Sequence, residues 1–310
     1  MQPKRIITPY EPIFPGVSNF GDQKISQNYE EMQRLRTKAL RAPLVHGLRF
    51  TLSLKIPAQN PTSGSRPIPS LPTTGPVTLE LIQALQSGVD NNSQVWKARV
   101  VEVPETVLVL KIVQHSMCYN PCLSDFSWTD FRYPPDLAPD EAWAYTTLAA
   151  FQGLYIPYFF GCPTITTPSK ESADVLVLEY IPGPTLTSFF EGKAMDDDTC
   201  NSLAAGLETV AAVVKAGLLV PELAGDNFIV TGPPKKRVVV AIDLAGAPLV
   251  KTESLALMMQ QCHLFSLFAE TFGDSDESME LLYKWAKGNL SKDLRKTLVE
   301  LDHVPRKSVL

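Results

Sequence analysis

The chain has 310 residues, of which 45% are apolar, so it can bury one large hydrophobic core or two smaller ones. Its formal net charge is −5, so it has no excess of basic residues to neutralise the phosphates of a nucleic acid. This argues against a general nucleic-acid-binding protein. The five cysteines are odd in number and scattered, which argues against a disulfide framework. Only Cys118 and Cys122 lie close together, without a second Cys/His pair nearby, so a zinc site has little support.

The first 76 residues are predicted to form an arm outside the main domain. Residues 27–40 are expected to form an amphipathic helix and residues 47–56 a strand. Six prolines then fall within residues 57–76, a density that disfavours both helix and central strand. This part of the arm is therefore predicted to be a linker or disordered.

No targeting or membrane segment is expected. The N-terminus lacks the apolar run of a signal peptide. The most apolar long run, residues 203–220, is interrupted by Glu208 and Lys215 and is too polar for a membrane span. The chain is accordingly predicted to be a soluble protein of the cytoplasm or nucleus, with no membrane partner.

From Val77 onward, segments rich in β-branched residues come first and helical patterns later. The first three segments have turn residues between them and predict an antiparallel meander. The expected elements are strands over 77–85, 93–103 and 106–114, a helix over 140–154 capped by Asp140, a strand over 175–181, a helix over 196–219 with a buried stripe at Leu203, Leu207, Val210 and Val214, a hairpin over 227–244 that turns at residues 232–234, and helices from Thr252. This order indicates an α+β fold with a β-rich lobe followed by a helical one.

Two isolated charged residues are candidates for a binding role. Lys111 lies in the apolar strand "VLVLKIV", where a lysine is costly unless it is paired or lies at an interface. Glu141 opens the following helix in this prediction. Taken singly, Lys111 is best explained as a residue at a strand edge whose ammonium reaches water. Glu141 is best explained as a residue that complements the helix dipole. The functional alternative pairs the two, with the ammonium directed at an anionic ligand.

A second candidate pair is found on the predicted hairpin. Asn227 begins its first strand and Asp243 follows its second, so both are expected at the same end. Two oxygen ligands there, completed by phosphates and water, would suit Mg²⁺. The alternative is that Asn227 closes a turn and Asp243 merely ends a strand.

Taken together in chain order, these features resemble the eukaryotic protein-kinase fold. The segments "DEAWAYTTLAAFQGLYIPYFFG" and "VLVLEYIPGPTL" are similar to the helix-αC and hinge segments of a fungal protein-kinase-like family, and the resemblance runs from Val77 to Phe272. It implies a bilobal fold with a β-rich N-lobe over 77–178 and a short helical C-lobe over 179–310. It also implies ATP and Mg²⁺ as cofactors.

The resemblance assigns roles to individual residues. Lys111 matches the lysine that contacts the α- and β-phosphates, and Glu141 matches its partner on helix αC. Leu178 matches the gatekeeper, and Glu179 to Ile181 match the hinge beside the adenine. Asn227 and Asp243 match the two metal-binding residues, although Leu and Ala follow Asp243 where the family has Phe and Gly.

The chain departs from the family where chemistry takes place. In the glycine-rich pattern, Gly88 and Val95 are retained, but Asp90 and Ser93 stand where the family has glycines. Where the family has His, Arg and Asp, this chain has Val220, Pro221 and Glu222. The catalytic base would therefore be Glu222, whose side chain is one methylene longer than that of the family's aspartate. The segment after Asp243 is short and lacks the Ala-Pro-Glu sequence.

Three functions remain open on this basis. The favoured one is a pseudokinase that binds nucleotide weakly and acts through an unidentified protein partner. The alternative is an active ATP-dependent phosphotransferase, for protein or small molecule, that uses Glu222 as base. In the third, the likeness is architectural only and the N-terminal arm binds the partner.

Overall fold

The computed structural model describes residues 23–59, 62, 64–72, 74–88, 91–118, 134–193, 196–220, 223–234 and 236–247. The chain divides into two compact units, and the division passes through helix α2 (Pro134–Thr147) and again between Leu178 and Glu179. The first unit comprises the described residues of Met1–Ile56, Pro69–Ala142 and Phe160–Leu178, and the second those of Pro57–Ile68, Trp143–Phe159 and Glu179–Leu310. Helices and strands occur together, as the predicted α+β class requires.

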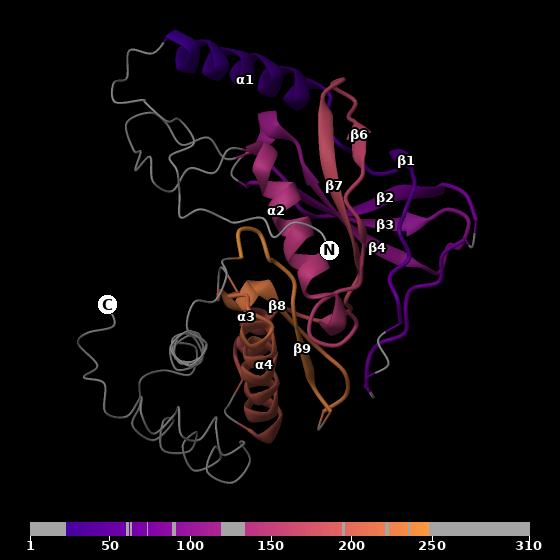
Figure 1. Cartoon of the computed structure of the whole chain (residues 1–310), viewed down its shortest axis with the longest axis vertical. Coiled ribbons are helices and arrows are strands. Elements are labelled where there is room, and N and C mark those ends of the chain that lie inside the picture. The colour runs from indigo at the N-terminus through magenta and orange to yellow at the C-terminus, as the bar shows by residue number, and fades with distance from the viewer. Residues whose placement is uncertain are drawn as a thin grey trace, which may run out of the picture. The chain divides into compact units, whose positions relative to one another are not determined.

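The first unit is built on a seven-stranded β-sheet (Figure 1). Its strands follow the order β1-β2-β3-β4-β7-β5, and β6 pairs with β7 outside this path. The bounds are β1 Arg49–Leu52, β2 Val77–Gln86, β3 Gln94–Val100, β4 Val107–Val113, β5 Phe159–Gly161, β6 Thr164–Thr166 and β7 Ser172–Glu179. The pairings β1–β2, β2–β3 and β3–β4 are antiparallel, which confirms the predicted meander.

Alternation along these strands explains why they pack as a sheet. In β3 every second residue is buried, as expected of a strand with one face on the core. The residues of β2, β3 and β4 that face this core are fully or almost fully buried: Leu79, Leu81, Ala98, Val100, Leu108, Leu110 and Ile112. The opposite face carries Lys111, Lys97 and Arg99 at alternating positions.

The N-terminal helix is longer than predicted and lies in the first unit. Helix α1 spans Gln23–Arg41 and contacts the 3₁₀ helix η1 (His115–Met117). The guanidinium of Arg36 donates to the carbonyl of Cys118 over 2.9 Å. This bond ties the arm to the C-terminal end of η1.

Helix α2 begins earlier than the sequence predicts. It starts at Pro134, so Asp140 is not its N-cap and Glu141 does not open it; both are interior residues. The predicted start of the helix at Asp140 was therefore wrong. Pro134 and Pro135 occupy the first turn, where the backbone N–H has no helical partner to lose and the fixed φ angle suits a helix. The helix ends at Thr147 and the 3₁₀ helix η2 (Ala149–Phe151) follows.

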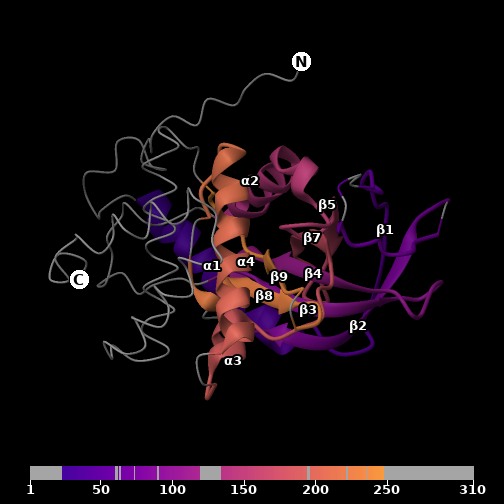
Figure 2. The ribbon, with the colours of Figure 1, turned by 90° about the horizontal axis from the view of Figure 1, so that it is seen from below.

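The second unit contains a long helix against a hairpin. Helix α4 spans Asp197–Lys215 and lies beside the hairpin of β8 (Phe228–Thr231) and β9 (Val238–Ala241), as Figures 1 and 2 show. The four predicted stripe residues are buried, which confirms the apolar face of this helix. Asp196 caps it through a reciprocal capping box with Thr199. The short helix α3 (Leu186–Phe190) precedes it, and η3 (Gly225–Asn227) leads into β8.

The proline-rich segment adopts neither helix nor strand in its described residues, as predicted. It is not a free linker, however, because its described residues between 57 and 68 belong to the second unit, where Gln59 and Arg66 donate hydrogen bonds to Tyr158 and Glu179. The domain limits at residues 76 and 178 stay predictions. The helices expected from Thr252 lie outside the described residues.

No helix among the residues that the structure describes is long and apolar enough to cross a membrane.

Candidate functional site

The strand lysine and the helix glutamate form a buried ion pair in the first unit. Lys111 Nζ lies 2.7 Å from Glu141 Oε2, and the side chains are 11% and 1% exposed. The explanation of Lys111 as a lysine reaching into water is therefore wrong, as is that of Glu141 as a residue that only complements the helix dipole. Burying two charges costs free energy that a good ion pair offsets only in part. Such a pair is therefore unusual unless the ammonium has a further task.

The position of Lys111 is set by the sheet register. Val95 of β3 lies directly opposite Lys111 of β4. Directly opposed residues of antiparallel strands point to the same face, so Val95 and Lys111 share one face of the sheet. The structure thus brings together the predicted binding residues Val95, Lys111 and Glu141.

Gly88 lies in the turn that joins β2 to β3. It is exposed and has a φ angle of +110°, a conformation that residues with a side chain rarely adopt, and no atom lies within 4 Å of the position a Cβ would take. Ser93, at the position of a lost glycine, is buried. Asp90, at the other such position, lies outside the described residues.

The gatekeeper and hinge candidates follow one another at the end of β7. Leu178 is buried in the first unit, and Glu179 and Ile181 are buried in the second. The backbone N–H of Glu179 donates to the carbonyl of Tyr158 over 2.9 Å. Its carboxylate forms an ion pair with Arg66, at 2.7 Å from the guanidinium Nε.

The hinge continues into a close backbone contact with the hairpin. Gly183 has a φ angle of +151°, and a Cβ at this position would lie 2.1 Å from the carbonyl oxygen of Val230. The N–H of Val230 donates to the carbonyl of Pro184 over 2.9 Å. Only glycine permits this approach, so the sequence "PGP" holds the chain after the hinge against β8.

Asn227 and Asp243 are found at the same end of the hairpin, as the sequence predicts. Phe228 pairs with Ala241, and the N–H of Ile242 donates to the carbonyl of Asn227 over 2.9 Å. Asp243 Oδ1 accepts from the N–H of Ala245 over 3.0 Å. Amide and carboxylate oxygens suit Mg²⁺, which is commonly held by one or two protein ligands with phosphates and water. Within the described parts of the chain, no group of three or more His, Cys, Asp or Glu side chains could hold a metal ion.

The base candidate Glu222 lies outside the described residues, as does Pro221. Val220, at the position of the family's histidine, is buried. Asp226, to which the sequence assigns no catalytic role, accepts a hydrogen bond from the Thr185 hydroxyl over 2.9 Å. That bond fixes the start of β8 to the start of α3.

Sequence reasoning missed two residues that hold the candidate site. The Tyr145 hydroxyl donates over 2.8 Å to the carbonyl of Ile242, the residue before Asp243. Arg66 forms an ion pair with Glu179, which lies 113 positions later in the chain. A lone arginine between prolines was the only signal for Arg66, and a tyrosine one helical turn after Glu141 was the only one for Tyr145.

The described cysteines are not poised for chemistry. Burial, with the charge of Glu171, raises the pKa of the Cys118 thiol to about 12. Burial likewise raises the pKa of Cys162 to about 12 and that of Cys200 to about 11. Thiols with such pKa values stay protonated at neutral pH and are poor nucleophiles and metal ligands.

Comparisons with known proteins give a likeness of structure and none of sequence. No family model and no curated protein matches the sequence. The solved structure described as "WaaP in complex with acyl carrier protein" matches 71% of this chain and 83% of that chain, with 13% sequence identity and a TM-score of 0.45. A likeness at this level assigns neither a family nor an activity to the chain.

Proposed function

We propose that the chain is a protein-kinase-like protein that binds ATP or ADP with Mg²⁺ and transfers the phosphoryl group poorly or not at all. The observation that supports it most is the buried pair of Lys111 and Glu141, 2.7 Å apart. A charged pair is retained in an apolar environment at a cost in stability, which favours a role in ligand binding over a structural one. In the family that the sequence resembles, the lysine of this pair contacts the α- and β-phosphates and the glutamate holds the lysine in place.

The other candidates have matching tasks in this proposal. Leu178 would close the back of the adenine pocket, and the backbone of Glu179 to Ile181 would face the base. Asn227 and Asp243 would hold Mg²⁺, which supplies charge neutralisation between the phosphates when it is bound. Gly88 and Val95 would cover the nucleotide.

Weak or absent transfer is inferred from the sequence positions that depart from the family. Glu222 carries a carboxylate but places it about one bond length further from its backbone than aspartate does, and a misplacement of about 1 Å can cost about 100-fold in rate. With Asp90 and Ser93 in place of glycines, the loop above the phosphates would lie less closely on them and carry a repelling charge. The output of such a protein would be a contact with a protein partner.

An active phosphotransferase is the second candidate, and one observation favours it. Asn227 and Asp243 lie at the same end of the β8–β9 hairpin, and a metal site in this proposal would draw one ligand from each. A protein that had lost all use of the metal would have no need of this pair. Glu222 would then be the base, as in the sequence prediction.

Binding and turnover measurements separate these functions. Calorimetric titration of the full chain with Mg·ATP should show binding, which Lys111→Met should weaken by at least tenfold. Lys215→Met, the same substitution at an exposed residue at the end of α4, is the matched control and should leave binding unchanged. Lack of binding by the wild-type protein would contradict the proposal.

Incubation with labelled ATP then distinguishes a pseudokinase from an enzyme. We expect little phosphate release or transfer to a substrate panel. Turnover that Asp243→Ala abolishes would establish the phosphotransferase instead, whereas turnover that survives this substitution would come from a contaminant.

A further inference from the structure

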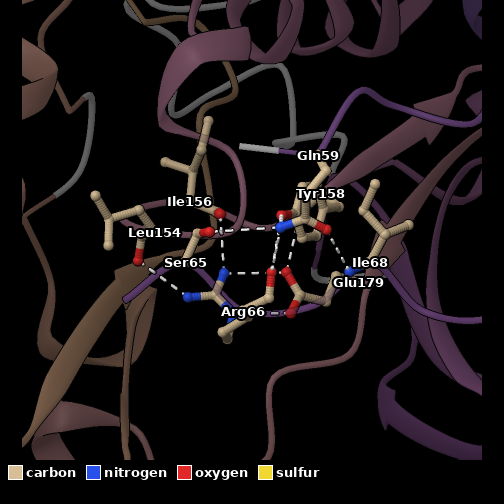
Figure 3. A network of polar contacts seen from close by, with 8 residues as sticks. All are labelled: Gln59, Ser65, Arg66, Ile68, Leu154, Ile156, Tyr158 and Glu179. Carbon is tan, nitrogen blue, oxygen red and sulfur yellow. Dashed lines mark hydrogen bonds and ion pairs between the residues drawn. The ribbon is translucent and has the colours of Figure 1, made fainter. Parts of the chain in front are cut away.

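Arg66 anchors the proline-rich segment to the candidate hinge (Figure 3). Its Nε lies 2.7 Å from Glu179 Oε1 and its Nη2 lies 3.0 Å from Oε2, which is the two-pronged geometry that arginine forms with carboxylates. The Arg66 and Glu179 side chains are 18% and 7% exposed. A charged fork so little exposed to water holds its partner in one orientation.

The guanidinium also donates two hydrogen bonds to the chain that precedes β5. Nη1 donates to the carbonyl of Leu154 over 3.0 Å, and Nη2 donates to the carbonyl of Ile156 over 3.0 Å. The Arg66 backbone N–H donates to the carbonyl of Gly153 over 2.7 Å. Arg66 thus binds Glu179 and the 153–156 segment at once.

The backbone of the proline-rich segment around Arg66 is also held by hydrogen bonds, through Tyr158 and Gln59. The Tyr158 hydroxyl donates to the carbonyl of Arg66 over 2.8 Å, and the amide of Gln59 donates to that hydroxyl over 3.0 Å. Gln59 Oε1 accepts from the N–H of Ile68 over 3.2 Å, which closes the segment on itself. Gln59 and residues 64–68, which we call the strap, are therefore held in a defined conformation by these hydrogen bonds.

Glu179 is held through both its main chain and its side chain. Its N–H donates to the Tyr158 carbonyl over 2.9 Å, and its Oε2 accepts from the Tyr158 N–H over 3.1 Å. With Arg66 on the same carboxylate, the last residue of β7 has little freedom to rotate. The conformation of the next two residues, Tyr180 and Ile181, starts from this fixed point.

We propose that Arg66 is a positioning residue for the nucleotide site, and that the strap of Gln59 and residues 64–68 controls how tightly the hinge holds the base. The inference rests on the proposed nucleotide-binding function and extends it to the regulation of that site by the N-terminal arm. Arg66 acts through Glu179 and not by touching the nucleotide. Displacing the strap, for instance through a partner that binds the arm, would lower affinity for the base and leave the phosphate contacts in place.

A matched arginine is available in the same unit. Arg237 forms the same two-pronged contact with Asp198, at 2.9 and 2.8 Å, also donates to a carbonyl, and has a side chain 17% exposed. Arg237, the residue before β9, contacts Asp198 of α4 and none of the hinge residues. Arg66→Lys and Arg237→Lys therefore make the same chemical change, but only Arg66→Lys alters a contact of Glu179.

The experiment measures the affinity of the full-length variants for two probes, Mg·ATP and Mg·tripolyphosphate. We expect Arg66→Lys to weaken Mg·ATP by about fivefold or more, the equivalent of one lost hydrogen bond, and tripolyphosphate by less than twofold. Arg237→Lys should leave Mg·ATP affinity unchanged. Tyr158→Phe, which removes the two hydrogen bonds of the hydroxyl to the strap and no charge, should weaken Mg·ATP binding in the same direction.

The outcomes separate this inference from the function on which it rests. If the wild-type protein binds no Mg·ATP, both are overturned. If it binds Mg·ATP and Arg66→Lys binds equally well, or if the two arginine variants lose affinity alike, only the positioning role is overturned. Equal weakening of both probes by Arg66→Lys would also overturn it, because a purely structural arginine acts on the whole site.

Discussion

Replacing Lys111 by methionine should destabilise the protein strongly, and more than replacing its partner Glu141 by glutamine. The substitution keeps the length of the side chain but leaves the Glu141 carboxylate, 1% exposed, without its cation at 2.7 Å. Loss of one member of a buried ion pair costs about 3–5 kcal/mol. Glu141→Gln instead strands the Lys111 ammonium, which is 11% exposed and keeps some access to water, so its cost should fall at or below about 3 kcal/mol.

Urea unfolding of the wild type, the two single variants and the double variant measures these terms as a double-mutant cycle. The double variant has no buried charge left at this position, so it should be more stable than Lys111→Met alone, and the coupling should exceed about 1 kcal/mol. Additive losses, or single losses within about 0.5 kcal/mol of the wild type, would show that the two charges do not interact in the folded protein.

Three further predictions test the second unit. Gly183→Ala should lower the free energy of unfolding by more than about 1 kcal/mol, because its Cβ would lie 2.1 Å from the Val230 carbonyl; an unchanged urea midpoint would contradict the close contact. Asp196→Ala should cost about 1 kcal/mol through loss of the α4 cap, whereas Asp196→Asn should cost much less, as circular dichroism melts would show. A hydrogen bond from Arg237 lowers the pKa of Asp198, so this pair stabilises the fold above the ordinary aspartate pKa of 3.8 and loses that effect as the pH falls through the lower, folded pKa. The stability difference between wild type and Arg237→Lys should therefore shrink in acid; a difference independent of pH would refute the pairing.

Much of the fold follows from local patterns in the sequence. Segments rich in β-branched residues, with turn residues between them, predicted the meander of β2 to β4. Acidic residues before an apolar stripe predicted α4 with its cap, and glycine followed by two prolines predicted the turn between β8 and β9. The same end of that hairpin then had to carry both Asn227 and Asp243.

Features that depend on tertiary contacts could not be predicted in this way. The start of α2 was misplaced because proline both ends helices and begins them, and local sequence does not distinguish the two uses. The strap was taken as a linker because its order comes from Arg66, whose carboxylate partner is distant in sequence. A proline-rich composition indicates that a segment forms neither helix nor strand. It does not indicate that the segment is disordered.

The pairing of Lys111 with Glu141 illustrates the limit for the candidate site. Each residue alone is best explained without a function, and the sequence offered the pairing only through the order of elements. The register that sets Val95 opposite Lys111 follows from the meander, but the rotation of α2 that directs Glu141 toward Lys111 depends on packing. Roles for these residues in binding nucleotide therefore stay predictions.

Thermal melting of the full chain with ATP or ADP, with and without Mg²⁺, tests the central claim most directly. A nucleotide at about 100 times its Kd should stabilise the protein by about 2.7 kcal/mol and raise the Tm by several degrees, more so with Mg²⁺ present. Asp243→Ala should remove the Mg²⁺-dependent part of the shift. A Tm that does not move at millimolar nucleotide, with or without Mg²⁺, would contradict the proposal that this chain binds nucleotide.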